Sequence, residues 1–318
     1  MISRAALILA AGLFVSACSD ETDPSSASSA AEVTPAEAAS VRTFDLPVLF
    51  DCLRENNGTA IAAHRGGPYP GHPENAVETM QYGFDNDVRV FEIDIAESQD
   101  GVLFLMHDRT LTRTTSGEGF VAEHDWADIR ALNLIDNDGN ETEFHPPTLR
   151  DALDWAVETG AILELDKKPT TSFRNIIAEV REAGAENNVL LISYNDDQAA
   201  NIAKIAPDLM MTASARGGRD IETLEGLGVK RENLIAWTGT NSPDKAAWAR
   251  VSDEGVEAAF GTLGRPGERL DDEYLADGDG SEYQILVDNG LVLLATDAPL
   301  EAAEAIDGDD VARNKCGL

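Results

Sequence analysis

Short apolar runs alternate with stretches of helical periodicity along the chain from residue 59 onward. Runs that are apolar at nearly every position are typical of strands buried on both faces, as in a parallel sheet covered by helices. There are eight such runs, at residues 60–63, 88–95, 161–165, 189–192, 209–212, 234–237, 256–260 and 291–295. Helical patterns separate most of them, at residues 149–157, 173–181, 198–205, 221–227, 245–251 and 283–287. The sequence therefore predicts an α/β protein that forms a closed (β/α)₈ TIM barrel.

One further apolar run, residues 102–106, does not fit this scheme. Only residues 97–101, which include an Asp-Gly hairpin signal, separate it from the preceding strand, and a parallel crossover needs many more residues. We therefore expect a β-hairpin after the second strand, whose return brings His107 down to the level of Asp94. The turn-rich residues 108–147 are expected to form a loop excursion that covers the barrel mouth.

Residues 1–17 have the pattern of an export signal. One positive charge precedes an apolar stretch, residues 5–15, that is too short to span a bilayer. Small residues before Cys18 resemble a bacterial lipoprotein signal, so cleavage before this cysteine and lipid attachment to it are expected. Residues 18–42 would then form a disordered tether that holds the barrel domain, residues 43–318, on the periplasmic side of the membrane. The alternative is a plain secretory signal and a soluble periplasmic or secreted protein.

Two cysteines, Cys52 and Cys316, lie near the two ends of the barrel domain. The ends of a barrel meet in space, and export leads to an oxidising compartment, so a disulfide is one interpretation. Two unrelated buried thiols are the other. Residues 45–55 predict a short helix that closes the barrel floor, with Asp45 as its N-cap.

Acidic residues greatly outnumber basic ones. The chain has 58 Asp and Glu against 24 Lys and Arg, and a formal net charge of -34. A surface of this charge repels phosphate backbones and anionic headgroups. We therefore expect a small-molecule substrate, no nucleic-acid partner, and contact with a membrane only through the lipid anchor on Cys18.

Two of the predicted strands carry acidic side chains in alternate positions. Glu92 and Asp94 alternate with apolar residues, so both face the barrel interior, and Glu164 and Asp166 repeat the pattern. Acids this close repel one another unless a cation or protons lie between them, and oxygen ligands favour Mg²⁺ or Ca²⁺. Either Glu164 or Asp166 could complete a three-carboxylate site, and Lys168 would add a positive charge toward a phosphate. The alternative is a set of solvated acids at strand ends.

Two histidines and a tryptophan also follow predicted strands. His64 ends the first run, at the end of the barrel where active sites are built. His107 ends the hairpin return and faces the same cavity. Imidazole titrates near neutral pH, so two histidines beside a cation suit acid–base transfer, although either ring alone could be structural. Trp237 ends the sixth run, where it could stack on an alcohol group or pack against the wall.

These residues together resemble the glycerophosphodiester phosphodiesterase family. The resemblance covers about residues 59–306, in the family's order and spacing. The matching segments are His64-Arg65-Gly66, Pro73-Glu74-Asn75, Glu92-Ile93-Asp94, Asp100-Gly101, His107-Asp108, Leu111-Thr112-Arg113-Thr114-Thr115, Pro147-Thr148-Leu149 and Thr296-Asp297-Ala298-Pro299.

The resemblance implies a (β/α)₈ barrel that binds Ca²⁺ or Mg²⁺ through Glu92 and Asp94, with His64 and His107 as the acid–base pair. The implied reaction is metal-dependent hydrolysis of a glycerophosphodiester to an sn-glycerol phosphate and an alcohol. Two other functions stay open at this point. One is a related barrel phospholipase that acts on phosphatidylinositol or sphingomyelin, and the other is a lipoprotein that binds phosphodiesters without cleaving them.

The resemblance also implies roles for residues that no local pattern singles out. Arg65 would hold a phosphate oxygen, where a guanidinium fork fits. Glu74 would lie near the metal or the glycerol. For the third metal carboxylate, the family has an acid two residues before a lysine, which favours Asp166 before Lys168, with aspartate in place of the family's glutamate. Glu164 is the alternative.

Overall fold

The computed structural model of the chain describes residues 44–306 and 311–318. The expected signal peptide, residues 1–17, and the expected tether, residues 18–42 with Cys18, lie outside these residues. None of the helices in 44–306 and 311–318 combines the length and the apolar character that a membrane crossing requires.

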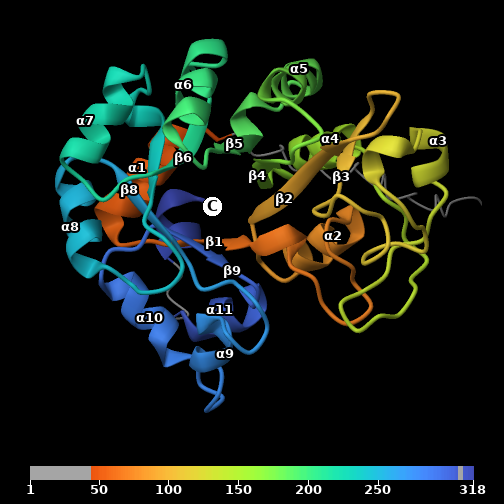
Figure 1. Ribbon diagram of the computed structural model, residues 1–318. Coiled ribbons are helices and arrows are strands. Elements are labelled where there is room, and N and C mark those ends of the chain that lie inside the picture. The colour runs from red at the N-terminus through yellow and green to blue at the C-terminus, as the bar shows by residue number, and fades with distance from the viewer. Residues whose placement is uncertain (1–43, 307–310) are drawn as a thin grey trace, which may run out of the picture. The chain divides into compact units, whose positions relative to one another are not determined.

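Eight parallel strands close into a barrel (Figure 1). Each strand pairs with the next along the ring, and β1 pairs with both β2 and β9, which closes it. The strands are β1 (Ala60–Ala63), β2 (Val90–Glu97), β4 (Ile162–Lys167), β5 (Val189–Ile192), β6 (Met210–Ser214), β7 (Leu234–Trp237), β8 (Glu257–Gly261) and β9 (Leu293–Thr296). Each of the eight apolar runs in the sequence overlaps one of these strands, so the predicted (β/α)₈ TIM barrel is confirmed.

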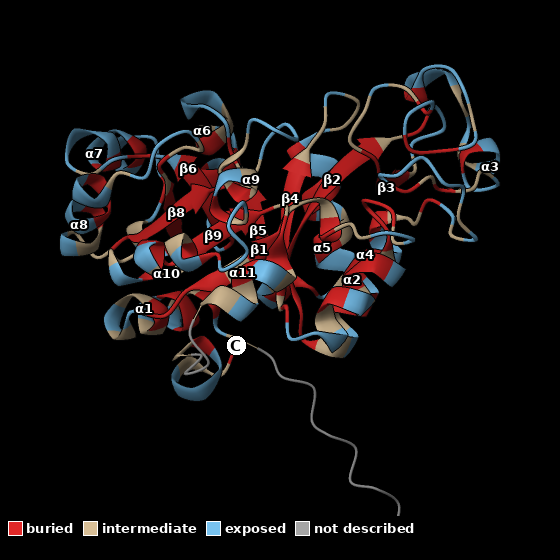
Figure 2. Ribbon diagram, turned by 90° about the horizontal axis from the view of Figure 1, so that it is seen from below, coloured by how far each residue is buried: buried red, intermediate tan, exposed pale blue. Residues whose placement is uncertain are grey.

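Helices surround the barrel, and their buried faces turn toward the strands (Figure 2). They are α2 (Val77–Asp85), α4 (Leu149–Thr159), α5 (Phe173–Ala183), α6 (Asp196–Ile205), α7 (Arg219–Gly226), α8 (Lys245–Asp253), α9 (Leu270–Tyr274), α10 (Ser281–Asp288) and α11 (Pro299–Ala305). Short turns add η1 (His64–Gly66), η2 (Val121–Glu123), η3 (Glu186–Asn188), η4 (Arg231–Asn233) and η5 (Ala312–Cys316). The six helical patterns in the sequence correspond to α4 to α8 and α10. The sequence did not predict α2, α9 and α11, of which the last two span only 5 and 7 residues.

Helix α1 (Leu46–Asn56) closes the floor of the barrel. As predicted, the side chain of Asp45 caps this helix, because it accepts the backbone N–H of Val48. One apolar cluster joins the helix to the inward side chains at the starts of the strands. Its members include Leu46, Leu49, Phe50 and Leu53 from the helix and Ala60, Val90, Ile162, Leu190, Met210, Ile235, Ala259 and Leu293 from the strands. This apolar floor leaves polar chemistry to the opposite end of the barrel, toward which the strand arrowheads point in Figure 2.

The predicted hairpin after the second barrel strand is present. Strand β3 (Leu103–Leu105) runs antiparallel to β2, with Leu105 opposite Ile95 and Leu103 opposite Glu97. The backbone N–H of Met106 donates to the carbonyl of Asp94. The return therefore ends with His107 close to the level of Asp94, as the sequence indicated.

The excursion after β3 does not cover the barrel mouth, so that expectation was wrong. Residues 108–147, which include α3 (Trp126–Ile129), lie beside β2 and β3 in Figure 1. They pack on an apolar cluster of their own, which buries Phe104, Met106, Leu111, Val121 and Ile129. This core, which turn signals alone do not reveal, directs the excursion sideways and leaves the mouth open.

A disulfide joins Cys52 of α1 to Cys316 of η5, with a Cα–Cα distance of 5.7 Å. The sequence left open whether these two cysteines are bonded. The bond links the helix on the barrel floor to the end of the chain, where Leu318 packs into the same apolar cluster.

We expect Cys52→Ser to lower the free energy of unfolding by about 2–4 kcal/mol, because the bond closes a long loop and restricts the unfolded chain. The two cysteines are 264 positions apart in sequence. Urea denaturation without reductant measures the difference, and the wild-type protein in reductant, which should match the variant, is the control. Equal stabilities, or a mass that reveals two free thiols in the oxidised protein, would contradict the bond.

Candidate active site

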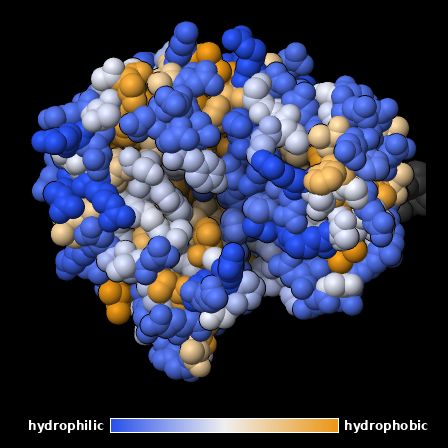
Figure 3. Space-filling view, in the orientation of Figure 1, coloured by the Kyte–Doolittle hydropathy of each residue, from blue (hydrophilic) through white to orange (hydrophobic). Residues whose placement is uncertain are grey.

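A cavity of about 310 Å³ opens at the carboxyl ends of the strands. Titratable side chains cluster on its wall near β1, β2 and β4, and much of the opposite wall is neutral. The titratable residues include His64, Glu92, Asp94, His107, Glu164, Asp166 and Lys168, and the neutral ones include Ile192, Ser193, Thr212, Ser214, Trp237 and Leu263. Figure 3 shows this face hollowed near its centre, with hydrophilic surface on the side of β2. Every site residue predicted for the barrel mouth lines the cavity except Arg65 and Glu74.

Three buried carboxylates lie together at the edge of the cavity. Strands β2 and β4 are neighbours in parallel register, with Glu92 opposite Glu164 and Asp94 opposite Asp166. Oxygen atoms of Glu92, Asp94 and Asp166 all lie within 4.8 Å of one another. Burial raises the pKa of Glu92 well above its usual value, and the charges of Asp94 and Asp166 raise it further. The three acids therefore need a compensating positive charge before all of them can ionise.

The structure separates the two candidates for the third carboxylate. Asp166 belongs to the cluster, whereas Glu164 lies one layer deeper in the barrel, opposite Glu92. Burial and the nearby Asp166 raise the pKa of Glu164 to about 7. The register of β2 against β4 thus places Asp166, two residues before Lys168, beside the other two acids.

The three acids fit a divalent cation. Oδ1 of Asp166 is buried and has no hydrogen-bond partner among the described residues, so an acceptor is left for a ligand. Carboxylate oxygens are the donors that hard cations prefer. The ammonium of Lys168 lies 2.5 Å from Oδ1 of Asp94 and 2.6 Å from Oδ2 of Asp166. Burial alone would raise the pKa of Asp94, but Lys168 and then His107 hold it below its usual value. Lys168 thus lines the cavity as expected, already paired with two of the acids.

His64 is anchored through one ring nitrogen. Its Nδ1 lies 2.6 Å from Oδ1 of Asp297, and its Nε2 lies 3.9 Å from Oε2 of Glu92. The backbone N–H of Gly264 and the guanidinium of Arg269 both donate to Oδ2 of Asp297, each at 3.0 Å. Burial raises the pKa of Asp297, but the bond to His64 and the other donors bring it to about 2. No role for Asp297 was predicted from the sequence, although an acid just past the end of β9 was a signal.

His107 is anchored in the same way. Its Nδ1 lies 2.7 Å from Oδ1 of Asp108, the next residue in the chain. Both histidines line the cavity, and neither Nε2 makes a hydrogen bond to another of the described residues. A carboxylate at Nδ1 fixes the tautomer and the orientation of an imidazole, which is the arrangement that proton transfer through Nε2 needs.

Arg65 follows His64 and begins a turn with its backbone in the left-handed region, at φ 54°. Its backbone N–H donates to Oε2 of Glu92 at 2.8 Å, and Nη1 donates to Oε2 of Glu74 at 3.1 Å. Its Nε is buried, lies 3.9 Å from Oδ2 of Asp94 and makes no hydrogen bond within the described residues. Glu74, expected near the metal or the glycerol, accepts the bond from Nη1 of Arg65, and Arg113 also donates to both of its oxygens.

Two aromatic residues lie on the wall beyond the acids. Trp237 at the end of β7 is partly buried, lines the cavity and also packs on the floor cluster. This position is compatible both with stacking on an alcohol group and with packing against the wall. The hydroxyl of Tyr194 donates to Oδ2 of Asp166 at 2.8 Å, although the residue as a whole is exposed. Tyr194 follows β5, and it was not predicted from the sequence as a site residue.

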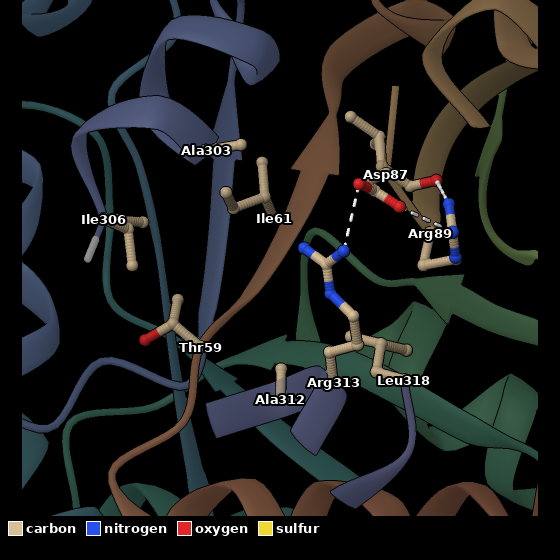
Figure 4. Close-up of a pocket in the computed structure, with 10 residues that line it drawn as sticks. Thr59, Ile61, Asp87, Arg89, Ala303, Ile306, Ala312, Arg313 and Leu318 are labelled. Atoms are coloured by element: carbon tan, nitrogen blue, oxygen red, sulfur yellow. Dashed lines mark hydrogen bonds and ion pairs between the residues drawn. The ribbon is translucent and has the colours of Figure 1, made fainter. Parts of the chain in front are cut away.

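A second cavity, of about 110 Å³, lies near the starts of β1 and β2 (Figure 4). Its charged groups are paired with one another, because Asp87 accepts from Arg89 at 3.1 Å and pairs with Arg313 at 2.9 Å. None of the predicted site residues lines it. The cavity at the barrel mouth is therefore the candidate active site.

Known proteins resemble this chain in sequence and in fold. The model of the Glycerophosphoryl diester phosphodiesterase family matches residues 64–217. A glycerophosphodiester phosphodiesterase of Caldanaerobacter subterraneus subsp. tengcongensis is 26% identical over 48% of this chain and 64% of its own length, so the match spans less than two thirds of that relative. A glycerophosphoryl diester phosphodiesterase of Parabacteroides distasonis superposes with a TM-score of 0.72 and 26% identity, over 84% of this chain and 92% of that one. A phosphodiesterase of Oleispira antarctica, solved with sn-glycerol-3-phosphate, shares the fold, with a TM-score of 0.60 and 21% identity over 80% of this chain and 99% of that one.

The placement of the acids generates a prediction for metal binding. We expect Asp166→Asn to weaken the binding of a divalent cation by at least about 10-fold, because one of three clustered charges is lost. Glu164→Gln, a matched change one layer deeper on the same strand, should leave the affinity close to that of the wild type. Isothermal titration calorimetry with Ca²⁺ and Mg²⁺ measures both. A larger loss in Glu164→Gln than in Asp166→Asn would show that the third ligand was assigned wrongly.

Proposed function

We propose that the chain hydrolyses glycerophosphodiesters to an sn-glycerol phosphate and an alcohol, because its residues 64–217 match the model of the Glycerophosphoryl diester phosphodiesterase family. One observation carries the proposal: two histidines, each anchored through Nδ1, line the same cavity as a buried cluster of three carboxylates. A phosphodiester needs a group that removes a proton, a group that supplies one, and positive charge beside its non-bridging oxygens. The site offers all three kinds of group.

Glu92, Asp94 and Asp166 would hold the cation, with Ca²⁺ or Mg²⁺ as the expected ions because all three ligands are carboxylates. When bound there, a divalent cation draws negative charge from the non-bridging oxygens of the phosphate. The unpartnered Oδ1 of Asp166 and the raised pKa of Glu92 both support this assignment.

His64 and His107 would move the protons. One Nε2 takes a proton from the attacking nucleophile, which is either a water molecule or the neighbouring hydroxyl of the glycerol. A new P–O bond forms as the bond to the alcohol breaks, and the other Nε2 gives a proton to the departing alcohol oxygen. Asp297 and Asp108 would each accept Nδ1–H of the neighbouring ring and turn its Nε2 toward the substrate. The ring that acts as base would be neutral, and the ring that acts as acid would be an imidazolium with a proton on Nε2.

The remaining residues would bind the rest of the substrate. The buried Nε of Arg65 makes no hydrogen bond within the part of the chain that the structure describes, so it can donate to a phosphate oxygen once a substrate is present. Lys168 would share its charge between the acids and the phosphate. Trp237, on the neutral wall, would contact an uncharged part of the substrate, while Glu74 would support Arg65 from behind.

The N-terminal segment supports a proposal about location. We propose that the protein is exported and anchored by lipid on Cys18, at the periplasmic side of the membrane. The disulfide between Cys52 and Cys316 supports export, because such bonds persist in oxidising compartments.

The proposed anchor makes a prediction for fractionation. Cys18→Ala should move the protein from the membrane pellet to the soluble fraction, because lipid on Cys18 would be its only link to the bilayer. Immunoblots of the two fractions measure the shift. Cys52→Ser, which removes a different cysteine, is the control and should stay in the pellet. An unchanged distribution for Cys18→Ala would refute the anchor.

We expect His64→Ala and His107→Ala each to lower turnover of glycerophosphocholine by about 100- to 10,000-fold, because each removes one proton-transfer group. His145→Ala is the matched control, since within residues 44–306 and 311–318 this exposed ring hydrogen-bonds only to the backbone carbonyl of Leu132. Release of sn-glycerol phosphate is measured with and without EDTA, and chelation should abolish it. Cleavage of phosphatidylinositol alone would favour the phospholipase instead, and binding without release in the wild type would favour a non-catalytic role.

A further inference from the structure

We propose that Arg113 is a positioning residue that holds His107 and Arg65 in fixed positions relative to each other. It does so across the boundary between the excursion, residues 108–147, and the barrel. The inference rests on the proposed function, because it concerns how two groups of that site are oriented. Arg113 does not line the cavity, so it acts on a substrate only through the residues that it binds.

One side of the Arg113 guanidinium binds the acid that orients His107. Its Nε donates to Oδ2 of Asp108 at 2.7 Å, and its Nη2 donates to Oδ1 at 2.9 Å. The same Oδ1 lies 2.7 Å from Nδ1 of His107. The bond from Arg113 is the largest of the causes that hold the pKa of Asp108 far below its usual range. Asp108 is thereby held as a carboxylate in one rotamer, with one oxygen facing the ring.

The other side of the guanidinium binds the acid behind Arg65. Nη1 donates to Oε2 of Glu74 at 2.8 Å, and Nη2 donates to Oε1 at 2.9 Å. Glu74 is only 3% exposed, and it also accepts from Nη1 of Arg65 at 3.1 Å. A buried carboxylate between two arginines has little freedom to reorient, so Glu74 transmits the position of Arg113 to Arg65.

The backbone that carries Arg113 is itself fixed. Leu111 is buried in the core of the excursion, and the hydroxyl of Thr115 donates to the carbonyl of Leu111 at 2.7 Å. Thr114, the next residue after Arg113, is also buried. The guanidinium thus extends from an ordered segment of the excursion toward Glu74, which lies between β1 and α2.

Arginine is required for this arrangement rather than positive charge alone. Two bidentate contacts need the planar fork of a guanidinium, and an ammonium offers a single point of charge. A lysine at position 113 could pair with Asp108 or with Glu74, but it could not fix both orientations. Misplacing a reacting group by about 1 Å is enough to lower a rate by about 100-fold.

The two contacts should separate in kinetics. Asp108→Asn disturbs His107, so it should lower kcat about 10- to 100-fold with little change in KM. Glu74→Gln disturbs Arg65, which binds phosphate, so it should mainly raise KM. Arg113→Lys should lower kcat and raise KM. The double variant with Asp108→Asn should lose less activity than the product of the two separate fold-losses, because the two residues act through one contact.

The test compares Arg113→Lys with Arg181→Lys on glycerophosphocholine. Arg181 is a matched control, because it also bridges two carboxylates, Asp208 and Glu186, but on α5 away from the cavity. Arg113→Lys should lower kcat/KM about 100-fold at an unchanged melting temperature, and Arg181→Lys should leave it unchanged. Added guanidinium ion should restore part of the kcat of Arg113→Ala. Equal kinetics in Arg113→Lys and the wild type, or a loss explained entirely by unfolding, would overturn the proposal.

A second measurement does not depend on turnover. The ¹⁵N spectrum of the His107 ring, assigned with His107→Gln, reports which nitrogen carries the proton. Arg113→Lys should change the populations of the tautomers, and Arg181→Lys should not; an unchanged spectrum would refute the positioning role even in an inactive protein. A wild-type enzyme without activity on any phosphodiester would instead refute the proposed function, so the two failures are distinguishable.

Discussion

Three buried carboxylates share one small volume at the barrel mouth, and the groups around them are arranged to offset their mutual repulsion. Asp94 has the most support, from the ammonium of Lys168 at 2.5 Å and the side-chain amide of Asn75 at 2.7 Å. Glu92 has the backbone N–H of Arg65 at 2.8 Å, and its pKa stays raised because it is buried beside the other acids. The protein therefore stabilises part of the charge itself and leaves the rest to a proton or a cation.

The barrel tolerates this repulsion because it separates its polar and apolar interiors along the strands. On β4 the inward residues change from Ile162 near the floor to Glu164 and then to Asp166 at the mouth. Helix α1 seals the apolar end with Phe50 and Leu53, both fully buried. Burial of the floor supplies stability that does not depend on the site, so the acids can be placed for binding rather than for stability.

Alternation within a strand is a local property, so the sequence was sufficient to predict the barrel strands and the inward direction of Glu92 and Asp94. The register between strands depends on how the whole barrel closes, which is why the residues alone left Glu164 and Asp166 as alternatives. Contacts across loops are harder still. The anchoring of His64 by an acid after β9 needs the conformations of two loops, and no periodic pattern encodes them.

The two histidines reach the cavity by different routes, and this difference gives the surrounding ion pairs their importance. His64 directly follows a strand of the closed barrel, whereas His107 follows the return strand β3, which leads into residues 108–147, and these fold on a core of their own. A unit with its own core is free to shift against its neighbour unless something joins them. Surface ion pairs contribute little stability one by one. The ion pair between Arg113 on the excursion and the buried Glu74 on the barrel would serve another purpose, because it would fix the distance between two groups that we propose act on the same phosphate.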